Sequence, residues 1–260
     1  MAHTIWTLDR GSGPIVATAV HDGHAVRAEV AREMALDEAT RLREEDPFTG
    51  RWTTIAPTRV IATRSRFEVD LNRPRETAVY RTPEEAWGLE VWDDVLPEDI
   101  VERSLEGYDA FYDKLRSLYG DLERRYGNFL VLDLHSYNHR REGPEGPVAD
   151  PTENPQVNIG TGTMKDRSRW ARVIDRFIDE LTSFDFPGGR LDVRENVKFR
   201  GGACAAWTHR TFPRSSCVLS IEVKKFFMDE WTGEADEVLL GAVGEALAST
   251  LPGALEELGR

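Results

Sequence analysis

The stretch "LVLDLHSYNHR", residues 130 to 140, begins as an apolar run and ends in polar side chains. In the longer run "NFLVLDL" apolar and polar residues do not alternate, which predicts a strand buried on both faces of a sheet. Such strands are typical of parallel sheets covered by helices. Asp133, His135 and Ser136 then come where this strand is expected to end.

Three interpretations of His135 follow from these residues. It is a core histidine paired with Asp133, a metal ligand, or the base of a serine hydrolase that uses Ser136. No G-x-S-x-G elbow surrounds Ser136, which disfavours the serine hydrolase. The rest of the chain has to separate the other two.

Segments of strand and helix character alternate along the chain. Strands are expected at residues 14–20, 60–63, 67–71, 157–163, 196–199 and 217–226, and helices at residues 25–43, 97–126, 170–181 and 233–250. This order predicts an α/β fold: one domain over residues 1–260, with three layers and a mostly parallel mixed sheet between helices.

Composition excludes several classes of protein. A formal net charge of -13 disfavours a nucleic-acid binder, and a small anionic substrate would need local arginines. Cys204 and Cys217 alone make no disulfide framework, which favours a reducing cytoplasm. The opening "MAHTIWTLDRGSGP" lacks the pattern of a signal peptide, and no run of about 18 apolar residues predicts a membrane span. We therefore expect a soluble cytoplasmic protein.

Potential metal ligands lie at predicted strand ends, where ligands bind in open α/β sheets. His21 follows the first strand and His135 a later one. A hydrolytic zinc site needs about three protein ligands and one open position. The third would be a carboxylate, and both Glu45 and Asp46 of "REEDPF" are available on a loop. His24 in "HDGH" could also chelate, but we rank it below His21 because it begins the following helix.

Glu222 interrupts the apolar strand "CVLSIEVKKF". An ionised acid is costly to bury there. One interpretation is a structural ion pair with Lys224, two residues further along the chain. The other is a general base, with its pKa raised by burial.

The span "TRSRFEVDLNRPR" concentrates positive charge in an acidic chain. Its four arginines are Arg64, Arg66, Arg73 and Arg75. Arginine binds carboxylates bidentately and stabilises oxyanions. Ion pairs with neighbouring acids at the surface are the alternative, and they explain Arg75 better than Arg73.

Five motifs now occur in a specific order: "SRFEVDLNRP", "LVLDLHSY", "NIGTGT", "NVKFRGG" and "LSIEVKKFFM". Together they resemble the N-formylglutamate amidohydrolase family over roughly residues 14 to 230. That family is a branch of the zinc carboxypeptidase-like hydrolases, and the aspartoacylases have a related "DLNR" motif. The resemblance implies a carboxypeptidase-like fold with a single Zn²⁺ ion.

The resemblance also implies roles for individual residues. His21 and His135 would ligate zinc, with Glu45 or Asp46 as the third ligand, and Glu222 would be the general base. Two motifs differ from the usual family pattern: the first reads "VHDGH" rather than "PHSG", and the acidic one reads "EEDPF".

The remaining implied roles concern the substrate. Arg66 would polarise the scissile carbonyl, and Asn72 with Arg73 would hold the substrate carboxylate. The expected reaction converts N-formyl-L-glutamate to glutamate and formate. Another N-acyl amino acid, a small peptide cut by a carboxypeptidase, and a non-catalytic binding role are the alternatives.

Overall fold

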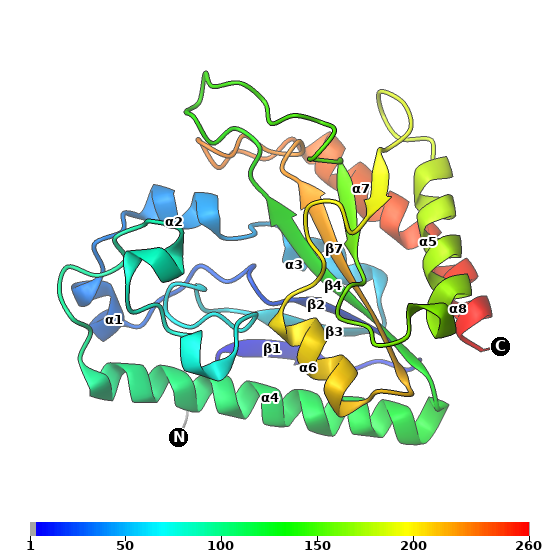
Figure 1. The fold of residues 1–260 in the computed structure, drawn as a ribbon, viewed down its shortest axis with the longest axis horizontal. Helices are drawn as coiled ribbons and strands as arrows, with labels where there is room; N and C mark the ends of the chain where they lie inside the picture. Colours follow the sequence, from blue (N-terminus) through cyan, green and yellow to red (C-terminus); the bar gives the residue numbers. More distant parts are fainter. Residues whose placement is uncertain (1–3, 260) are drawn as a thin grey trace.

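The stretch from residue 130 lies in β4 (Phe129–Tyr137), near the middle of a seven-stranded sheet. The structure, a computed structural model, describes residues 4–259. All nine residues of β4 are buried, as its unbroken apolar pattern predicts. Figure 1 shows this strand crossing the molecule between layers of helices.

The sheet is mixed but mostly parallel, as the sequence predicts. Its order is β1-β3-β2-β4-β7-β5-β6. The other strands are β1 (Trp6–Asp9), β2 (Ile15–Ala19), β3 (Thr58–Ala62), β5 (Val157–Gly160), β6 (Val193–Glu195) and β7 (Ser216–Lys224). The four central strands, β3, β2, β4 and β7, are parallel to one another. At the two ends of this group, β1 pairs antiparallel with β3 and β5 pairs antiparallel with β7.

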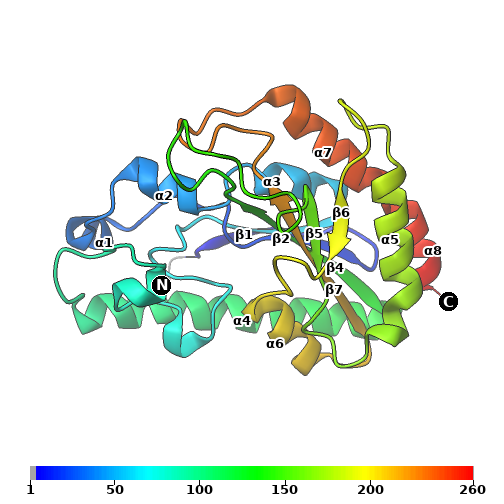
Figure 2. The same ribbon diagram turned by 45° about the horizontal axis from the view of Figure 1, so that its top comes forward.

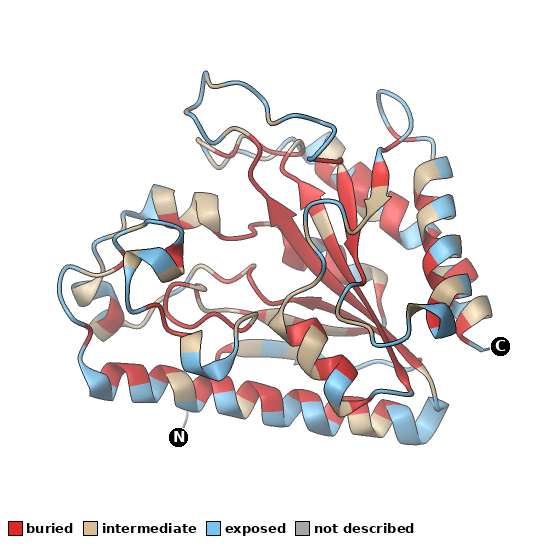
Figure 3. Cartoon of the chain, in the orientation of Figure 1, coloured by how far each residue is buried: buried red, intermediate tan, exposed pale blue. Residues whose placement is uncertain are grey.

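Helices cover both faces of the sheet, which gives the expected three layers. They are α1 (Ala28–Glu33), α2 (Glu38–Glu44), α3 (Thr49–Trp52), α4 (Glu98–Tyr126), α5 (Ala171–Ser183), α6 (Ala203–Thr211), α7 (Glu237–Ser249) and α8 (Leu251–Leu258). Ala17 and Leu132 pack in a core with residues of α5, α7 and α8, whereas Val16 and Val131 pack with α4 and α6. Figure 2 shows α4 and α6 on one side and α5, α7 and α8 on the other, and Figure 3 shows the buried sheet between them.

The α7–α8 segment is apolar for a structural reason. Glu237–Leu258 is long and apolar enough to cross a membrane by length and composition. Its inward side chains, among them Leu240, Val243 and Leu258, belong to the core beside the sheet. Burial against the sheet therefore accounts for the apolar character of its inward face.

Some predicted elements differ from the structure. Residues 25–43 form two helices rather than one, because Met34 makes an isolated bridge with Trp92 and Asp37 caps the second helix. The predicted strand 67–71 is a series of turns, in which the amides of Glu68 and Val69 donate to the carbonyl of Ser65. All five residues are buried, and the alternation of apolar with acidic side chains produced the strand-like pattern.

The region around the "RGG" motif also differs. Residues 196–199 are a loop, because Asn158 Oδ1 accepts hydrogen bonds from the amides of Val197 and Lys198. The short strand β6 lies just before this loop. Gly201 and Gly202 of this motif lead directly into α6, a helix that the sequence analysis does not predict.

The helix predicted at 97–126 is confirmed as α4, which begins after Pro97 and ends before Gly127 at φ 75°. Phe111 is fully buried at its centre and meets Trp6 edge-on.

We predict that Phe111→Ala lowers the free energy of unfolding by about 3–5 kcal/mol. Urea unfolding measures this, with the exposed Asp113→Ala as a control expected to stay within about 0.5 kcal/mol. Equal effects of the two variants would contradict this account of the core.

Candidate active site and metal centre

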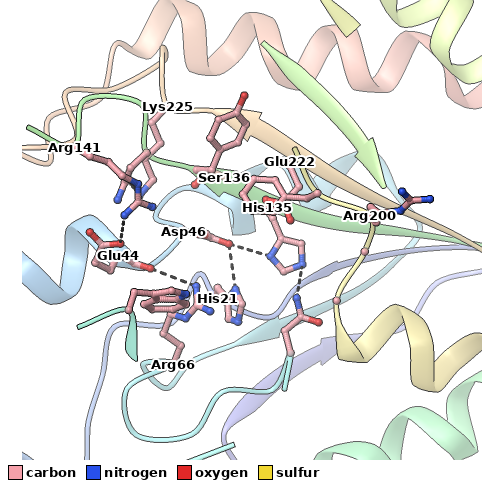
Figure 4. A pocket seen from close by; sticks show the side chains of 17 residues that line it. His21, Glu44, Asp46, Arg66, His135, Ser136, Arg141, Arg200, Glu222 and Lys225 are labelled. Atoms are coloured by element: carbon pink, nitrogen blue, oxygen red, sulfur yellow. Dashed lines mark hydrogen bonds and ion pairs between the residues drawn. The ribbon is translucent and has the colours of Figure 1, made fainter. Parts of the chain in front are cut away.

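A cavity of about 250 Å³ opens beside the carboxyl ends of the central strands. Its wall carries acids, histidines and cationic side chains together (Figure 4). The lining residues are His21, Glu44, Asp46, Arg66, Asn72, Trp87, His135, Ser136, Tyr137, Asn138, Arg141, Phe199, Arg200, Gly201, Gly202, Glu222 and Lys225. Six of the eight residues to which the sequence analysis assigns site roles line this cavity: His21, Asp46, Arg66, Asn72, His135 and Glu222.

Three buried side chains meet in this wall. His21 lies two residues beyond β2, His135 lies within β4, and Asp46 lies in the loop after α2. Asp46 Oδ2 is 3.3 Å from His21 Nδ1 and 3.0 Å from His135 Nδ1. One ligand atom from each residue falls within 4.8 Å of the others, which makes them a possible metal site.

The outer nitrogens of the two rings are held by further carboxylates. His21 Nε2 is 2.7 Å from Asp70 Oδ1, and His135 Nε2 is 3.2 Å from Asp133 Oδ2. With a metal ion bound, a proton on each Nε2 would face these carboxylates and leave both Nδ1 lone pairs for the ion; without the ion, each Nδ1 can donate to Asp46 Oδ2. Two imidazoles and one carboxylate are the ligands of hydrolytic zinc sites, so the residues fit a divalent ion such as Zn²⁺.

The acid of this group is ionised. Burial raises the pKa of Asp46, but the hydrogen bonds with His135 and His21 outweigh burial and hold that pKa well below its usual value. A cation placed among the three ligand atoms would therefore meet a negative charge.

The side chains of Glu45 and Asp46 have different partners, and only Asp46 contacts His21 and His135. Glu45 Oε2 lies 2.5 Å from His24 Nδ1, and Ser65 Oγ donates to Glu45 Oε1. Glu45 has an extended backbone, with φ -81° and ψ 177°, so the next side chain points to the opposite side. Asp46 therefore reaches the histidines, while Glu45 binds His24 behind them.

Glu222 lies directly beside His135, because β4 and β7 pair in parallel with these residues in register. It lines the cavity, and in residues 4–259 no ion pair joins it to Lys224. Burial raises the pKa of Glu222 from 4.5 to about 7, against the opposing charge of His135. This is the range that suits a general base near neutral pH.

Arg66 is held rigidly at the cavity wall. Its Nη2 and Nε donate to Asp70 Oδ2 at 2.8 and 3.2 Å, and Nη1 donates to the carbonyl of Glu44 at 3.4 Å. The guanidinium also stacks on Trp87, 4.8 Å from the ring centroid. Such fixed donors can stabilise developing negative charge without reorganisation.

Asn72 and Arg73 have different positions. Asn72 lines the cavity with Nδ2 3.5 Å from His135 Nε2, and its Oδ1 accepts from the amide of Cys204. Arg73 is absent from the lining and lies over the ring of Tyr80, 4.7 Å from its centroid. Arg75 forms the surface ion pair expected of it, but with Asp109 of α4.

The importance of Asp70 was missed by the sequence interpretation, which treated it only as an ion-pair partner. Its Oδ1 meets His21 and accepts from the amide of Asn72, while Oδ2 accepts from Arg66 and from the hydroxyl of Tyr80. Burial raises the pKa of Asp70, but the charges of Arg66 and His21 outweigh burial and hold it well below its usual range. The sequence feature that could have indicated this role was the position of Asp70 as the first residue of the "DLNR" motif.

Comparison with known proteins gives a family match and matches to solved structures. The family model for N-formylglutamate amidohydrolase matches residues 13–228. Among solved structures, N-formylglutamate amidohydrolase from Ralstonia eutropha JMP134 has a TM-score of 0.77 at 20% identity, with 97% of each chain covered. A gene product from Agrobacterium tumefaciens has a TM-score of 0.61 at 18% identity, covering 95% of this chain and 96% of the other. No curated protein sequence matches the chain.

We predict that Asp46→Ala abolishes stoichiometric Zn²⁺ binding while Glu45→Gln retains it. Loss of a ligand should weaken binding by more than the roughly 10- to 100-fold typical of an outer partner. Equilibrium dialysis followed by metal analysis checks both variants against the unaltered protein. Equal metal loss in both variants would contradict the assignment of Asp46.

Proposed function

The chain belongs to the N-formylglutamate amidohydrolase family, and on that premise we propose that it is a zinc-dependent enzyme that cleaves the amide of an N-acyl amino acid. The preferred substrate in this proposal is N-formyl-L-glutamate. The supporting observation is one cavity in which three buried ligand atoms, a half-buried acid of raised pKa and a fixed guanidinium lie together.

His21, Asp46 and His135 would hold the ion in this proposal. The chemistry that Zn²⁺ supplies there is Lewis-acid polarisation and a lowered pKa for water in the cavity. Asp70 and Asp133 orient the two imidazoles and so preserve the direction of their lone pairs.

Glu222 would act as the base and then as the acid. Its carboxylate takes a proton from the attacking water as the oxygen bonds to the amide carbon. The same proton passes to the nitrogen as the carbon–nitrogen bond breaks, which releases the carboxylic acid of the acyl group and a free amine. Its raised pKa suits both steps.

Arg66 would stabilise the negative charge that develops on the amide oxygen. Asp70, Trp87 and the carbonyl of Glu44 hold its guanidinium in place before the substrate arrives. Asn72 would contact the substrate carboxylate, with Arg73 contributing charge from outside the lining. Arg141 and Arg200 add positive charge to the cavity of an otherwise acidic chain.

A second observation favours longer N-acyl substrates as the alternative. A smaller cavity of about 110 Å³ shares Glu44, Trp87, Asn138 and Arg141 with the main one. A longer acyl group or a second amino acid could extend past Trp87 into this space. Rates for formyl-, acetyl- and peptidyl-glutamate compared on one preparation decide between the substrates, and a clear preference for the peptide would favour a carboxypeptidase.

Glu222→Gln should lower kcat/KM by about 10²–10⁴-fold with Zn²⁺ content unchanged, because it removes the base and leaves the three ligands in place. Formate release from N-formyl-L-glutamate measures the activity. The exposed Glu153→Gln, outside the cavity lining, is the matched control. Full activity in Glu222→Gln would refute the proposed base, and an inactive zinc-loaded parent protein would refute the enzyme itself.

The pH profile should show the ionisation of Glu222. The base must be deprotonated, so kcat/KM falls as the pH drops through its pKa. Burial raises this pKa from 4.5 to about 7, and a bound dication would draw it back down. We therefore expect an acidic limb with an apparent pKa between these values. The residual activity of Glu222→Gln should lack that limb, and an identical limb in the variant would assign the ionisation to another group.

A further inference from the structure

Lys225 is a buried cation that the proposed mechanism does not use. It follows β7 directly, three residues after Glu222, and its side chain is among the largest that are fully buried. Between residues 4 and 259 it makes no ion pair with a carboxylate. An ammonium is costly to bury, so its partners must account for its presence.

All three ammonium protons have an acceptor. Lys225 Nζ donates to the carbonyl of Arg43 at 2.6 Å, to the carbonyl of Glu45 at 2.8 Å and to Asn138 Oδ1 at 2.8 Å. A lysine ammonium has three donors, so this set is complete. No donor is left for a substrate.

The acceptors belong to the segments that carry the metal ligands. Arg43 and Glu45 lie at the end of α2, immediately before Asp46, where helix carbonyls lack partners within the helix. Asn138 lies three residues after His135. Lys225 thus joins the loop of Asp46, the end of β4 and the end of β7 through one atom.

We infer that Lys225 is a positioning residue, which holds Asp46 against the two histidines and thereby strengthens metal binding. The inference rests on the proposed metal site. Other contacts also hold this loop: the amide of Asp46 donates to the carbonyl of His21 at 3.0 Å, and the side chain of Glu45 contacts Ser65 and His24. Without the ammonium, two carbonyls before Asp46 lose their donor and the loop loses its link to Asn138 at the end of β4.

Charge alone predicts the opposite effect. A positive group beside a cation site repels the cation, so its removal should tighten binding. Positioning predicts weaker binding on removal. The sign of the change in metal affinity therefore distinguishes the two roles.

The test compares Lys225→Met, Lys225→Arg and the matched control Lys224→Met with the parent protein. Zn²⁺ affinity is measured by competition with a chromophoric chelator, and the visible absorption of the Co²⁺-loaded protein reports the ligand geometry. We expect Lys225→Met to bind Zn²⁺ about 10- to 100-fold more weakly, with an altered Co²⁺ spectrum. Lys225→Arg should recover part of the affinity, because it restores donors and charge. Lys224→Met should match the parent, since Lys224 does not line the cavity.

Unchanged or tighter Zn²⁺ binding by Lys225→Met would overturn the inference. Failure of the parent protein to bind Zn²⁺ would instead refute the proposed function. Thermal unfolding of each metal-free variant shows whether it is folded. Should Lys225→Met not fold, Lys225→Gln is judged by the same change in affinity.

Discussion

The register between β4 and β7 is the constraint on which the site depends. Nine consecutive pairs hold these parallel strands together, and one of them sets His135 beside Glu222. Side chains alternate between the faces of a strand, so a slip by one residue would turn Glu222 away from the cavity. The same slip would exchange the side chains that now pack in the two cores on opposite faces of the sheet. Packing of the sheet therefore fixes the distance between a proposed ligand and the proposed base.

Asp70 makes a second connection, from the proposed metal centre to the proposed oxyanion site. One of its oxygens meets His21, and the other accepts from Arg66. Its negative charge is buried but well compensated, which is the condition under which an internal charge is tolerated. The orientation of the histidine and that of the guanidinium thus share one carboxylate.

The sequence predicted the layers, the mostly parallel sheet and the long helix, because all three depend on apolar patterns that burial imposes directly. It failed at residues 67–71, where apolar and acidic side chains alternate but all are buried in turns held by local hydrogen bonds. It also could not choose between Glu45 and Asp46, since that choice depends on the backbone angles at Glu45. The contact of Asp70 with His21 and those of Lys225 join segments that are distant in the chain, and only the "DLNR" motif gave a local signal for the first of them.

The distribution of the cavity wall along the chain affects how the protein is made. His21, Asp46 and His135 are all translated before residue 136, whereas Glu222 and Lys225 follow more than eighty residues later. Until then β4 lacks its neighbour β7, and the loop of Asp46 lacks the ammonium that binds it. A ribosome-bound chain that ends before β7 therefore carries three potential ligands without the frame that arranges them. Completion of the site is a late event in synthesis, set by the order of the strands.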